Sequence, residues 1–487
     1  MNSNKLTPIV QESIFNQNNL DNTKNVSFHS GMMIINSSMP SFIQTALPIK
    51  RSIKKSCGTS SKPSRINRII NIFNGRVSVN DNNILYCPLC NKPLSRNGTL
   101  TVGLKHIPLG GEYTELSVSK ARYVCSNKKC TYFWDESIPF KAEDHLHTIS
   151  VENYAIDLLR LGHTLKDVSL ITGLGKNVVK AIDKKRLEKL YTVNGDGKEL
   201  SRPTEITKHI GIDEFLLHKG HKYATIIMDL DTGHVLYLAH GKKKQVVYDF
   251  IDWVGIEWMK NVEALACDMN SDYEEAFEEK CPWIKTVFDR FHLIKNFNEK
   301  VITEVRKDEQ KRLLDEGKLE AAKALKGSKY ILQSNSTTRA ERSTDAQNGK
   351  VIQEAGGLFN RPEVKRQRDY EKEYDSLLKE NKLFFTIDLI KEKLEKAYKA
   401  KTERSMKIHI NRIIRLCKET DNKHFKWFAK LLENHMEGII NHAIFHISSG
   451  KVEGTNNMIK TMRRKGYGYN DDDYFFLKII DASCRNS

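Results

Sequence analysis

The chain has 487 residues, which is enough for about three domains and a sizeable hydrophobic core. Its formal net charge of +17 indicates a polyanionic partner, with nucleic acid the first candidate and an acidic membrane surface the second. No apolar run approaches the ~20 residues that span a bilayer, and no secretory signal is visible, so membrane insertion is not expected. Nine cysteines are too few for a disulfide scaffold at this length, which indicates a reducing, cytoplasmic location.

Residues 1–83 are predicted to form a mostly disordered, basic tail. Residues 1 to about 49 are rich in Asn and Ser and show no sustained hydrophobic period. The segment from Lys50 to Arg76 has no acidic residue, and the sequence leaves open whether it is simply solvated or contacts phosphate groups. Its eight basic residues are Lys50, Arg51, Lys54, Lys55, Lys62, Arg65, Arg68 and Arg76.

Four cysteines within residues 84–147 have the spacing of a metal site. Cys87 and Cys90 form one short-spaced pair, Cys125 and Cys130 form another, and 34 residues separate the two pairs. Two facing pairs of thiolates make a tetrahedral site that zinc usually occupies. We therefore predict a zinc-finger domain with a structural Zn²⁺ over residues 84–147; four buried free cysteines are the less favoured alternative.

Residues 148–205 are predicted to form a helix-turn-helix. Helical periodicity runs from about 148 to about 192, Thr164 and Asp167 have the spacing of a helix N-terminal cap, and Gly173 marks a turn. The second helix of such a motif enters the major groove of DNA. A plain helical hairpin is the alternative, but the basic outward face favours DNA binding. The outward residues assigned to DNA are Lys176, Asn177, Lys180 and Lys184.

Residues 206–310 are predicted to be the first part of an α/β core. The runs IGIDEFLL, YATIIMDLDTG and HVLYLAHG indicate three consecutive strands, the last two joined at a tight turn. A helix, a strand, a helix, a strand and a helix follow, ending with LIKNFNEKVITEVRK. This is the element order of an RNase H-like core, in which the first and fourth strands are neighbours. Residues 311–446 are predicted to be a helical insertion, broken by a polar stretch at about 334–350, and residues 447–487 contain the last helix, from about Ser449 to Gly466.

Two carboxylates come at the ends of apolar strands in this core. Asp213 lies on the first strand and Asp268 ends the fourth, so the predicted topology brings them together. Because each directly follows an apolar run, its burial must be offset by a cation or another partner. The alternative for each is an ordinary surface or turn carboxylate, which is how the nearby Asp229, Asp231, Glu214 and Asp272 are interpreted.

A third carboxylate, Glu453, lies in the first turn of the predicted last helix. A carboxylate there and cations in the last turn both agree with the helix dipole. Val452, Ile459 and Met462 fall on a different face from Glu453. The alternative is an ordinary amphipathic surface helix. The residues of this helix assigned to DNA binding are Asn457, Lys460, Arg463 and Arg464.

Taken together, these segments resemble the DDE transposases of bacterial insertion sequences of the ISL3 group. The likeness covers most of the chain from about residue 84 onward. It rests on CPLC, on HIPLGG before the second Cys pair, on GIDEFLLHKGHKYATIIMDLDTG, on FDRFHLIKN and on KVEGTNNMIKTMRRKGYGY. The resemblance implies a zinc finger, a helix-turn-helix and an RNase H-like catalytic domain with a helical insertion before the last acid. The basic tail departs from the family pattern.

The resemblance also implies roles for individual residues. Asp213, Asp268 and Glu453 would be the catalytic acids, and they would hold two Mg²⁺ (or Mn²⁺) ions. Asp289 and His292 would form an Asp-x-x-His element that supports the active site or orients DNA, although His292 taken alone could equally be a core histidine.

The implied function is metal-dependent cleavage and strand transfer at the terminal inverted repeats of an insertion sequence. The implied partners are double-stranded DNA and further copies of the chain, in a homodimer or larger assembly, at a cytoplasmic, nucleoid-associated location. Two alternatives remain at this point. One is a non-catalytic DNA-binding regulator derived from a transposase, and the other is a nuclease of RNase H-like fold that hydrolyses DNA without joining it.

Overall fold

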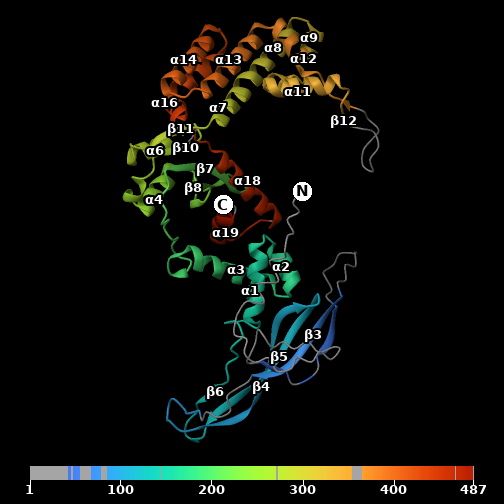
Figure 1. Ribbon diagram of the computed structural model, residues 1–487, viewed down its shortest axis with the longest axis vertical. Coiled ribbons are helices and arrows are strands. Elements are labelled where there is room, and N and C mark those ends of the chain that lie inside the picture. The colour runs from blue at the N-terminus through green and yellow to red at the C-terminus, as the bar shows by residue number, and fades with distance from the viewer. Residues whose placement is uncertain are drawn as a thin grey trace, which may run out of the picture. The chain divides into compact units, whose positions relative to one another are not determined.

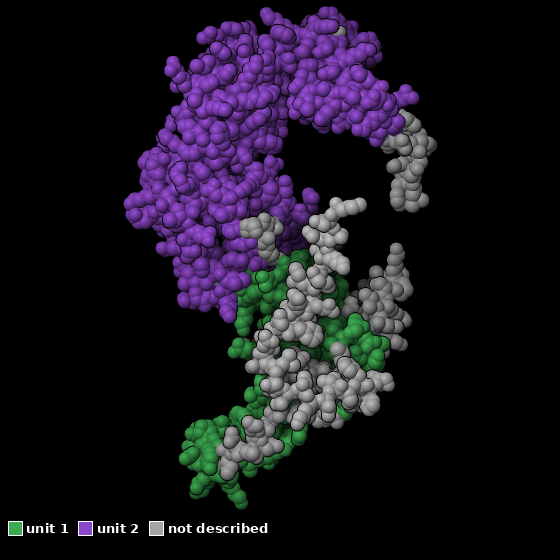
Figure 2. Space-filling view, in the orientation of Figure 1, with its two compact units in different colours: residues 1–188 green, residues 189–487 purple. Residues whose placement is uncertain are grey.

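The computed structural model describes residues 42–44, 46, 48–54, 67–77, 85–143, 145–269, 272–353, 365–466 and 468–485. Over these residues the fold is mixed α/β, with six-, five- and two-stranded sheets and many helices (Figure 1). The chain forms two compact units, residues 1–188 and 189–487 (Figure 2). None of the helices in the described ranges is long and apolar enough to cross a membrane.

The first unit contains a six-stranded sheet centred on a long hairpin. Strands β4 (Leu94–Leu109) and β5 (Glu112–Cys125) pair antiparallel across the turn at Gly110 and Gly111, which both have positive φ. Side chains that alternate along the strands form one core, which includes Leu104, Leu116 and Val118. The other strands are β1 (Phe42–Gln44), β2 (Ile49–Lys54), β3 (Asn67–Val77) and β6 (Phe133–Asp135).

The prediction of a disordered tail is wrong for β1, β2 and β3. Strand β3 pairs with β2 on one side and runs parallel to β5 on the other, and Phe73 is buried in the sheet core. The apolar residues of NRIINIFNGRV make a strand that the surrounding basic residues obscured. Within the basic segment, Lys50 pairs with Glu112 at 3.3 Å. Residues 1–41 and the predicted basic positions Lys55, Lys62 and Arg65 lie outside the described residues.

Three helices follow the sheet in sequence: α1 (Ile149–Arg160), α2 (Leu165–Thr172) and α3 (Lys176–Tyr191). The predicted cap is confirmed, because Thr164 and Asp167 make a reciprocal capping box at the start of α2. Gly173 ends α2 in the left-handed conformation, with φ of 75°. Val168, Val179 and Ile182 are buried where the three helices pack together.

The second unit is built on a five-stranded sheet in the order β11-β10-β7-β8-β9. As predicted, the first and fourth of these strands in sequence, β7 and β10, are neighbours, and they run parallel. The strands and the helices between them are β7 (His209–His218), β8 (Lys222–Asp229), β9 (Val235–His240), α4 (Lys244–Val254), α5 (Ile256–Met259), β10 (Ala264–Cys267), α6 (Tyr273–Lys280) and β11 (Lys285–Phe288).

The two faces of this sheet belong to different cores. Ile210 and Ile212 of β7 pack into a core shared with α4, α6 and the helices that follow β11. Phe215 and Leu217 of the same strand pack on the opposite face, in a core shared with α18 (Gly450–Lys465) and α19 (Asp472–Arg485). The sheet is therefore the middle layer between two sets of helices.

A long helical segment follows β11, beginning with α7 (Arg290–Asn296), which leads from the sheet toward the other helices (Figure 1). Its further elements are a π-helical stretch (Phe297–Ile302), α8 (Thr303–Asp315), α9 (Leu319–Leu325), α10 (Lys329–Gln333), α11 (Ser336–Gln347), β12 (Val351–Gln353), β13 (Lys365–Arg366), α12 (Tyr370–Glu380), α13 (Lys382–Tyr398), α14 (Glu403–Glu419), α15 (Lys423–Asn434), α16 (Met436–Ile440) and α17 (His442–Phe445).

Two features of this part differ from the prediction. The polar stretch at 334–350 is mostly helix α11, which Asn335 caps and whose buried Ser343 donates to Asp369 at 2.6 Å. Helix α18 has the predicted limits but is not the last helix, because α19 follows it and buries Tyr474 and Phe475.

Helix α18 lies against β7 with no room for a side chain at Gly211. A Cβ added there would lie 2.7 Å from side-chain carbons of both Leu230 and Val452. Gly454, on the same helix, has open space around its Cα.

We predict that Gly211→Ala lowers the free energy of unfolding by about 1–3 kcal/mol, because the added methyl group forces α18 away from the strand. Gly454→Ala should raise it by ~0.5–1 kcal/mol, because alanine favours a helix interior. Urea unfolding of the two variants measures both effects. Equal stability of the two variants would contradict the close packing of α18 on β7.

Candidate functional site

Asp213 and Asp268 lie at equivalent positions of two neighbouring parallel strands. Gly211 of β7 pairs with Ala266 of β10, and each aspartate follows its strand's paired residue by two positions. Because side chains alternate along a strand, both carboxylates project from the same face of the sheet, the face that α18 covers. The sequence prediction that these two acids meet is therefore supported by the strand register.

The Asp213 carboxylate is held by hydrogen bonds to both of its oxygens. Oδ1 accepts from the backbone N–H of Glu214 at 2.8 Å, and Oδ2 accepts from Nδ2 of Asn456 at 2.8 Å. Burial raises the pKa of Asp213, and the negative charge of Asp268 raises it further. A bound cation would lower the pKa of Asp213, because its positive charge stabilises the ionised carboxylate.

His292 lies beside this pair. Its Nδ1 is 3.3 Å from Oδ2 of Asp268, and the bond to that carboxylate raises the pKa of the imidazole, with the charges of Asp268 and Asp213 adding to the effect. The element predicted as Asp-x-x-His thus contacts the second acid through its histidine.

Asp289, the other member of that element, joins two helix starts. Its Oδ1 accepts from the N–H of Phe291 at 2.8 Å and caps α7. Its Oδ2 accepts from the backbone N–H of Ser449 at 2.8 Å and from the hydroxyl of the same residue, immediately before α18. Asp289 is only 5% exposed. It therefore fixes the start of α18 relative to α7, which carries His292.

Glu453 lies in the first turn of α18, as predicted, and its side chain is exposed. Its neighbour Val452 is buried against β7, so the helix start is anchored next to the strand that carries Asp213. The three predicted acids do not form a closed ligand cluster. Within the described ranges, only the four cysteines bring three or more ligand atoms within 4.8 Å of one another.

The donors around Asp213 fit a hard divalent cation. Carboxylate and amide oxygens are the ligands that Mg²⁺ and Mn²⁺ prefer. Asp213 and Asp268 supply two carboxylates of like charge on one face. Asn456 adds an amide oxygen, Oδ1, which is buried and has no hydrogen-bond partner among the described residues.

Sequence reasoning did not identify Asn456. Its position in the sequence could have identified it. The buried face of α18 contains Val452, Asn456 and Ile459 at helical spacing, so that Asn456 is a polar residue within an otherwise apolar stripe. The sequence favours a surface position for Glu214, but the residue is half-buried, and burial raises its pKa with a further contribution from Asp213.

The four residues of α18 that were assigned to DNA differ in exposure. Asn457, Lys460 and Arg464 are exposed. Arg463 is half-buried instead, and it donates to the carbonyl of Leu216 on β7 at 2.8 Å. Arg463 therefore ties the end of α18 to the strand, and its contact with DNA stays a prediction.

The predicted DNA-binding residues of α3 differ in exposure. Lys176 and Asn177 are exposed at the helix start, whereas Lys180 and Lys184 are half-buried. The start of α3 is therefore more exposed than the two lysines that follow it.

The four predicted zinc ligands meet in the first unit. Sγ of Cys87 lies 3.7 Å from Sγ of Cys130, and Sγ of Cys90 lies 3.3 Å from Sγ of Cys125. A tetrahedron with zinc–sulfur bonds of ~2.3 Å has sulfur–sulfur edges of ~3.8 Å, which is close to these distances. A backbone hydrogen bond at Lys92 lowers the pKa of Cys90 to about 7, whereas burial raises the pKa of Cys125. A bound cation would favour the thiolate form of both.

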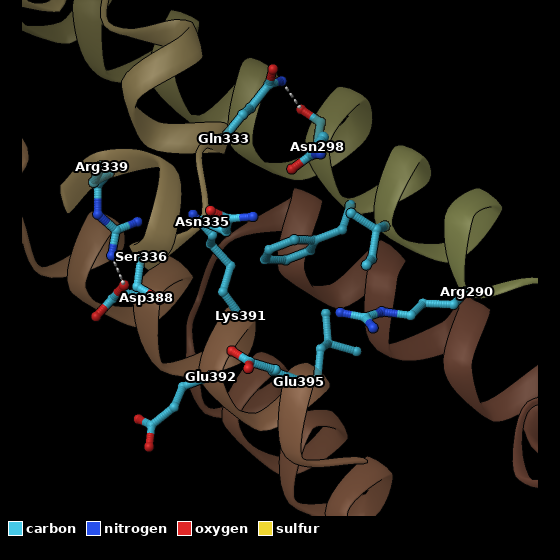
Figure 3. A pocket seen from close by; sticks show the side chains of 13 residues that line it. Arg290, Asn298, Gln333, Asn335, Ser336, Arg339, Asp388, Lys391, Glu392 and Glu395 are labelled. Carbon is cyan, nitrogen blue, oxygen red and sulfur yellow. Dashed lines mark hydrogen bonds and ion pairs between the residues drawn. The ribbon is translucent and has the colours of Figure 1, made fainter. Parts of the chain in front are cut away.

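A separate cavity of about 410 Å³ lies within the helical segment (Figure 3). Arg290 and Ile294 line it from α7, whereas His292, between them in sequence, contacts Asp268. Lys391 lies at its wall, donates to the carbonyl of Leu332 at 3.0 Å, and has its pKa lowered to about 8 by burial. This cavity is thus distinct from the acid pair.

Comparison with known proteins finds similarity to transposases of insertion sequences. The family model described as "Transposase", of the DDE type and ISL3 group, matches residues 210–479, more than half of the chain. The chain is 26% identical over 314 residues to the transposase for insertion sequence element IS1001 of Bordetella parapertussis. The aligned region covers 64% of this chain and 68% of the relative. It is 25% identical over 263 residues to the transposase for insertion sequence element IS1557 of Mycobacterium tuberculosis, and spans 57% of that protein's length.

Cys87→Ser should release most of the bound metal and destabilise the first unit, because a three-thiolate site loses much of its contribution to folding. Elemental analysis should find about one zinc per chain in the parent and far less in the variant. Cys417→Ser is the control, since Cys417 is buried away from the cluster in the second unit. Equal zinc in parent and Cys87→Ser would contradict the assignment.

Proposed function

Because the chain belongs to the ISL3 family of DDE transposases, we propose that it binds the terminal inverted repeats of an insertion sequence, cleaves the DNA there and joins the freed ends to a target. The observation that carries this proposal is the register of β7 and β10, which supports a shared role for Asp213 and Asp268 on one face of the sheet. The strand order β9-β8-β7-β10-β11 supports an RNase H-like catalytic core.

Asp213 and Asp268 would hold two divalent cations, Mg²⁺ or Mn²⁺, and Glu453 would complete the site when DNA and metal are bound. The bound ions would supply Lewis-acid activation of the attacking oxygen and stabilise charge on the phosphate. The protein's own side chains orient this site. His292 holds Asp268, and Asp289 fixes the start of the helix that carries Glu453.

DNA would be bound by two separate elements. Helices α2 and α3 would form a helix-turn-helix, and the exposed Lys176 and Asn177 at the start of α3 would enter the major groove. Lys460 and Arg464 of α18 would contact the phosphates beside the acids. The four-cysteine cluster would hold a structural Zn²⁺, and synapsis of two element ends would require a homodimer or larger assembly.

The proposal is tested by incubating the full chain with a labelled duplex carrying an element end and with a supercoiled plasmid. If the protein is an active transposase, we expect metal-dependent nicking of the duplex, followed by transfer of the label to the plasmid. Nicking without transfer would favour an RNase H-like nuclease, and binding without nicking would favour a DNA-binding regulator. Either of these outcomes would overturn the proposed reaction.

Asp268→Asn should slow cleavage by about a hundredfold or more, which corresponds to ~2.7 kcal/mol of activation free energy, because it removes a ligand charge at constant volume. Affinity for the element end, measured by a gel-shift assay, should be nearly unchanged. Asp272→Asn is the matched control, since Asp272 is exposed four residues away and its side chain makes no cap hydrogen bond. Cleavage by Asp268→Asn at the rate of that control would refute the acid-pair mechanism.

Two adjacent arginines of α18 should behave differently. Arg464→Ala should weaken DNA binding, and the slope of log affinity against log salt should become shallower by about one unit, because one phosphate contact is lost. Arg463→Ala should instead lower the free energy of unfolding by ~1–2 kcal/mol, because it removes the hydrogen bond to Leu216. Salt titrations and urea unfolding of both variants measure the contrast. An unchanged salt slope for Arg464→Ala would show that this helix face does not meet DNA.

A further inference from the structure

Asn456 is a buried polar residue on the face of α18 that packs against the sheet. It is 6% exposed, and the residues one turn before and one turn after it on this face, Val452 and Ile459, belong to the apolar core. A polar side chain in such a position destabilises the fold unless its hydrogen-bonding groups are satisfied. The role of this residue is therefore not explained by packing.

One end of the amide has a partner and the other does not. Nδ2 donates to Oδ2 of Asp213 at 2.8 Å, whereas Oδ1 is buried with no hydrogen-bond partner among the described residues. The second oxygen of Asp213 accepts from the N–H of Glu214. Each oxygen of the Asp213 carboxylate therefore accepts one hydrogen bond, and the two bonds fix its orientation. Each oxygen keeps one lone pair for a further partner.

We propose that Asn456 is a positioning residue of the metal site, which orients Asp213 for the divalent cation and offers its buried amide oxygen to the cation or to a water bound to it. This rests on the proposed function, because it assigns the cation to Asp213 and Asp268. A hydrated divalent cation supplies what the unpartnered Oδ1 lacks, since Mg²⁺ keeps several of its waters when proteins bind it. Residues that orient metal ligands typically change metal affinity when they are replaced.

The test is Mn²⁺ binding to the full chain, measured by calorimetry, in the parent and in Asn456→Leu. Leucine has a similar volume and suits the surrounding apolar face, so folding should be retained, and urea unfolding without metal checks this. The variant should bind Mn²⁺ about tenfold or more weakly, because a hydrogen bond to a charged group has been removed. The Mn²⁺ concentration for half-maximal cleavage should rise by the same factor, while cleavage at saturating Mn²⁺ recovers in part.

Two reference variants make the result decisive. Asp213→Asn should abolish Mn²⁺ binding at this site. Thr461→Ala should leave it unchanged, because Thr461 is an exposed residue of α18 whose hydroxyl donates to the carbonyl of Asn457 in the same helix. If the parent shows Asp213-dependent binding and Asn456→Leu binds equally well, the positioning role is refuted and the proposed function stands. If the parent shows no Asp213-dependent binding and no cleavage, the proposed function fails together with this inference.

Discussion

The parallel pairing of β7 with β10 is the constraint on which the rest of the second unit depends. It brings Asp213 and Asp268 to equivalent positions on one face of the sheet, where burial and the charge of Asp268 both oppose the ionised form of Asp213. A bound cation would stabilise the ionised carboxylate against both effects. The neighbouring groups, His292 on Asp268 and Asn456 on Asp213, are donors that orient the same two carboxylates. The fold thus holds like charges together where metal binding compensates for the repulsion.

Helix α18 connects this pair to the rest of the chain. Its start is fixed by Asp289 through Ser449, its middle contacts Asp213 through Asn456, and its end is tied to β7 by Arg463. The long helical segment between β11 and α18 is therefore inserted into the second unit without separating its parts, because Asp289 bridges the two ends of the insertion. The exposed face of the same helix remains available to a polyanion.

The sequence was sufficient to predict those parts of the fold that depend on local pattern. Alternating and β-branched runs predicted β7 to β11, and the order of elements predicted that Asp213 and Asp268 meet. Features that depend on tertiary contacts were missed. Strand β3 was hidden among basic residues and is stabilised by pairing with β5. The polar segment of α11 is held by its Asn335 cap and by the bond from Ser343 to the distant Asp369. The role of Asn456 could not be predicted, because a single polar residue on an apolar helix face does not reveal which residue it contacts.

The most direct test of this account is a crystal structure of the full chain with bound DNA and Mn²⁺, with the metal located by its anomalous scattering. The account predicts an anomalous peak within coordination distance, ~2.0–2.3 Å, of carboxylate oxygens of both Asp213 and Asp268. A peak bound to only one of these aspartates, or located away from both, would contradict it.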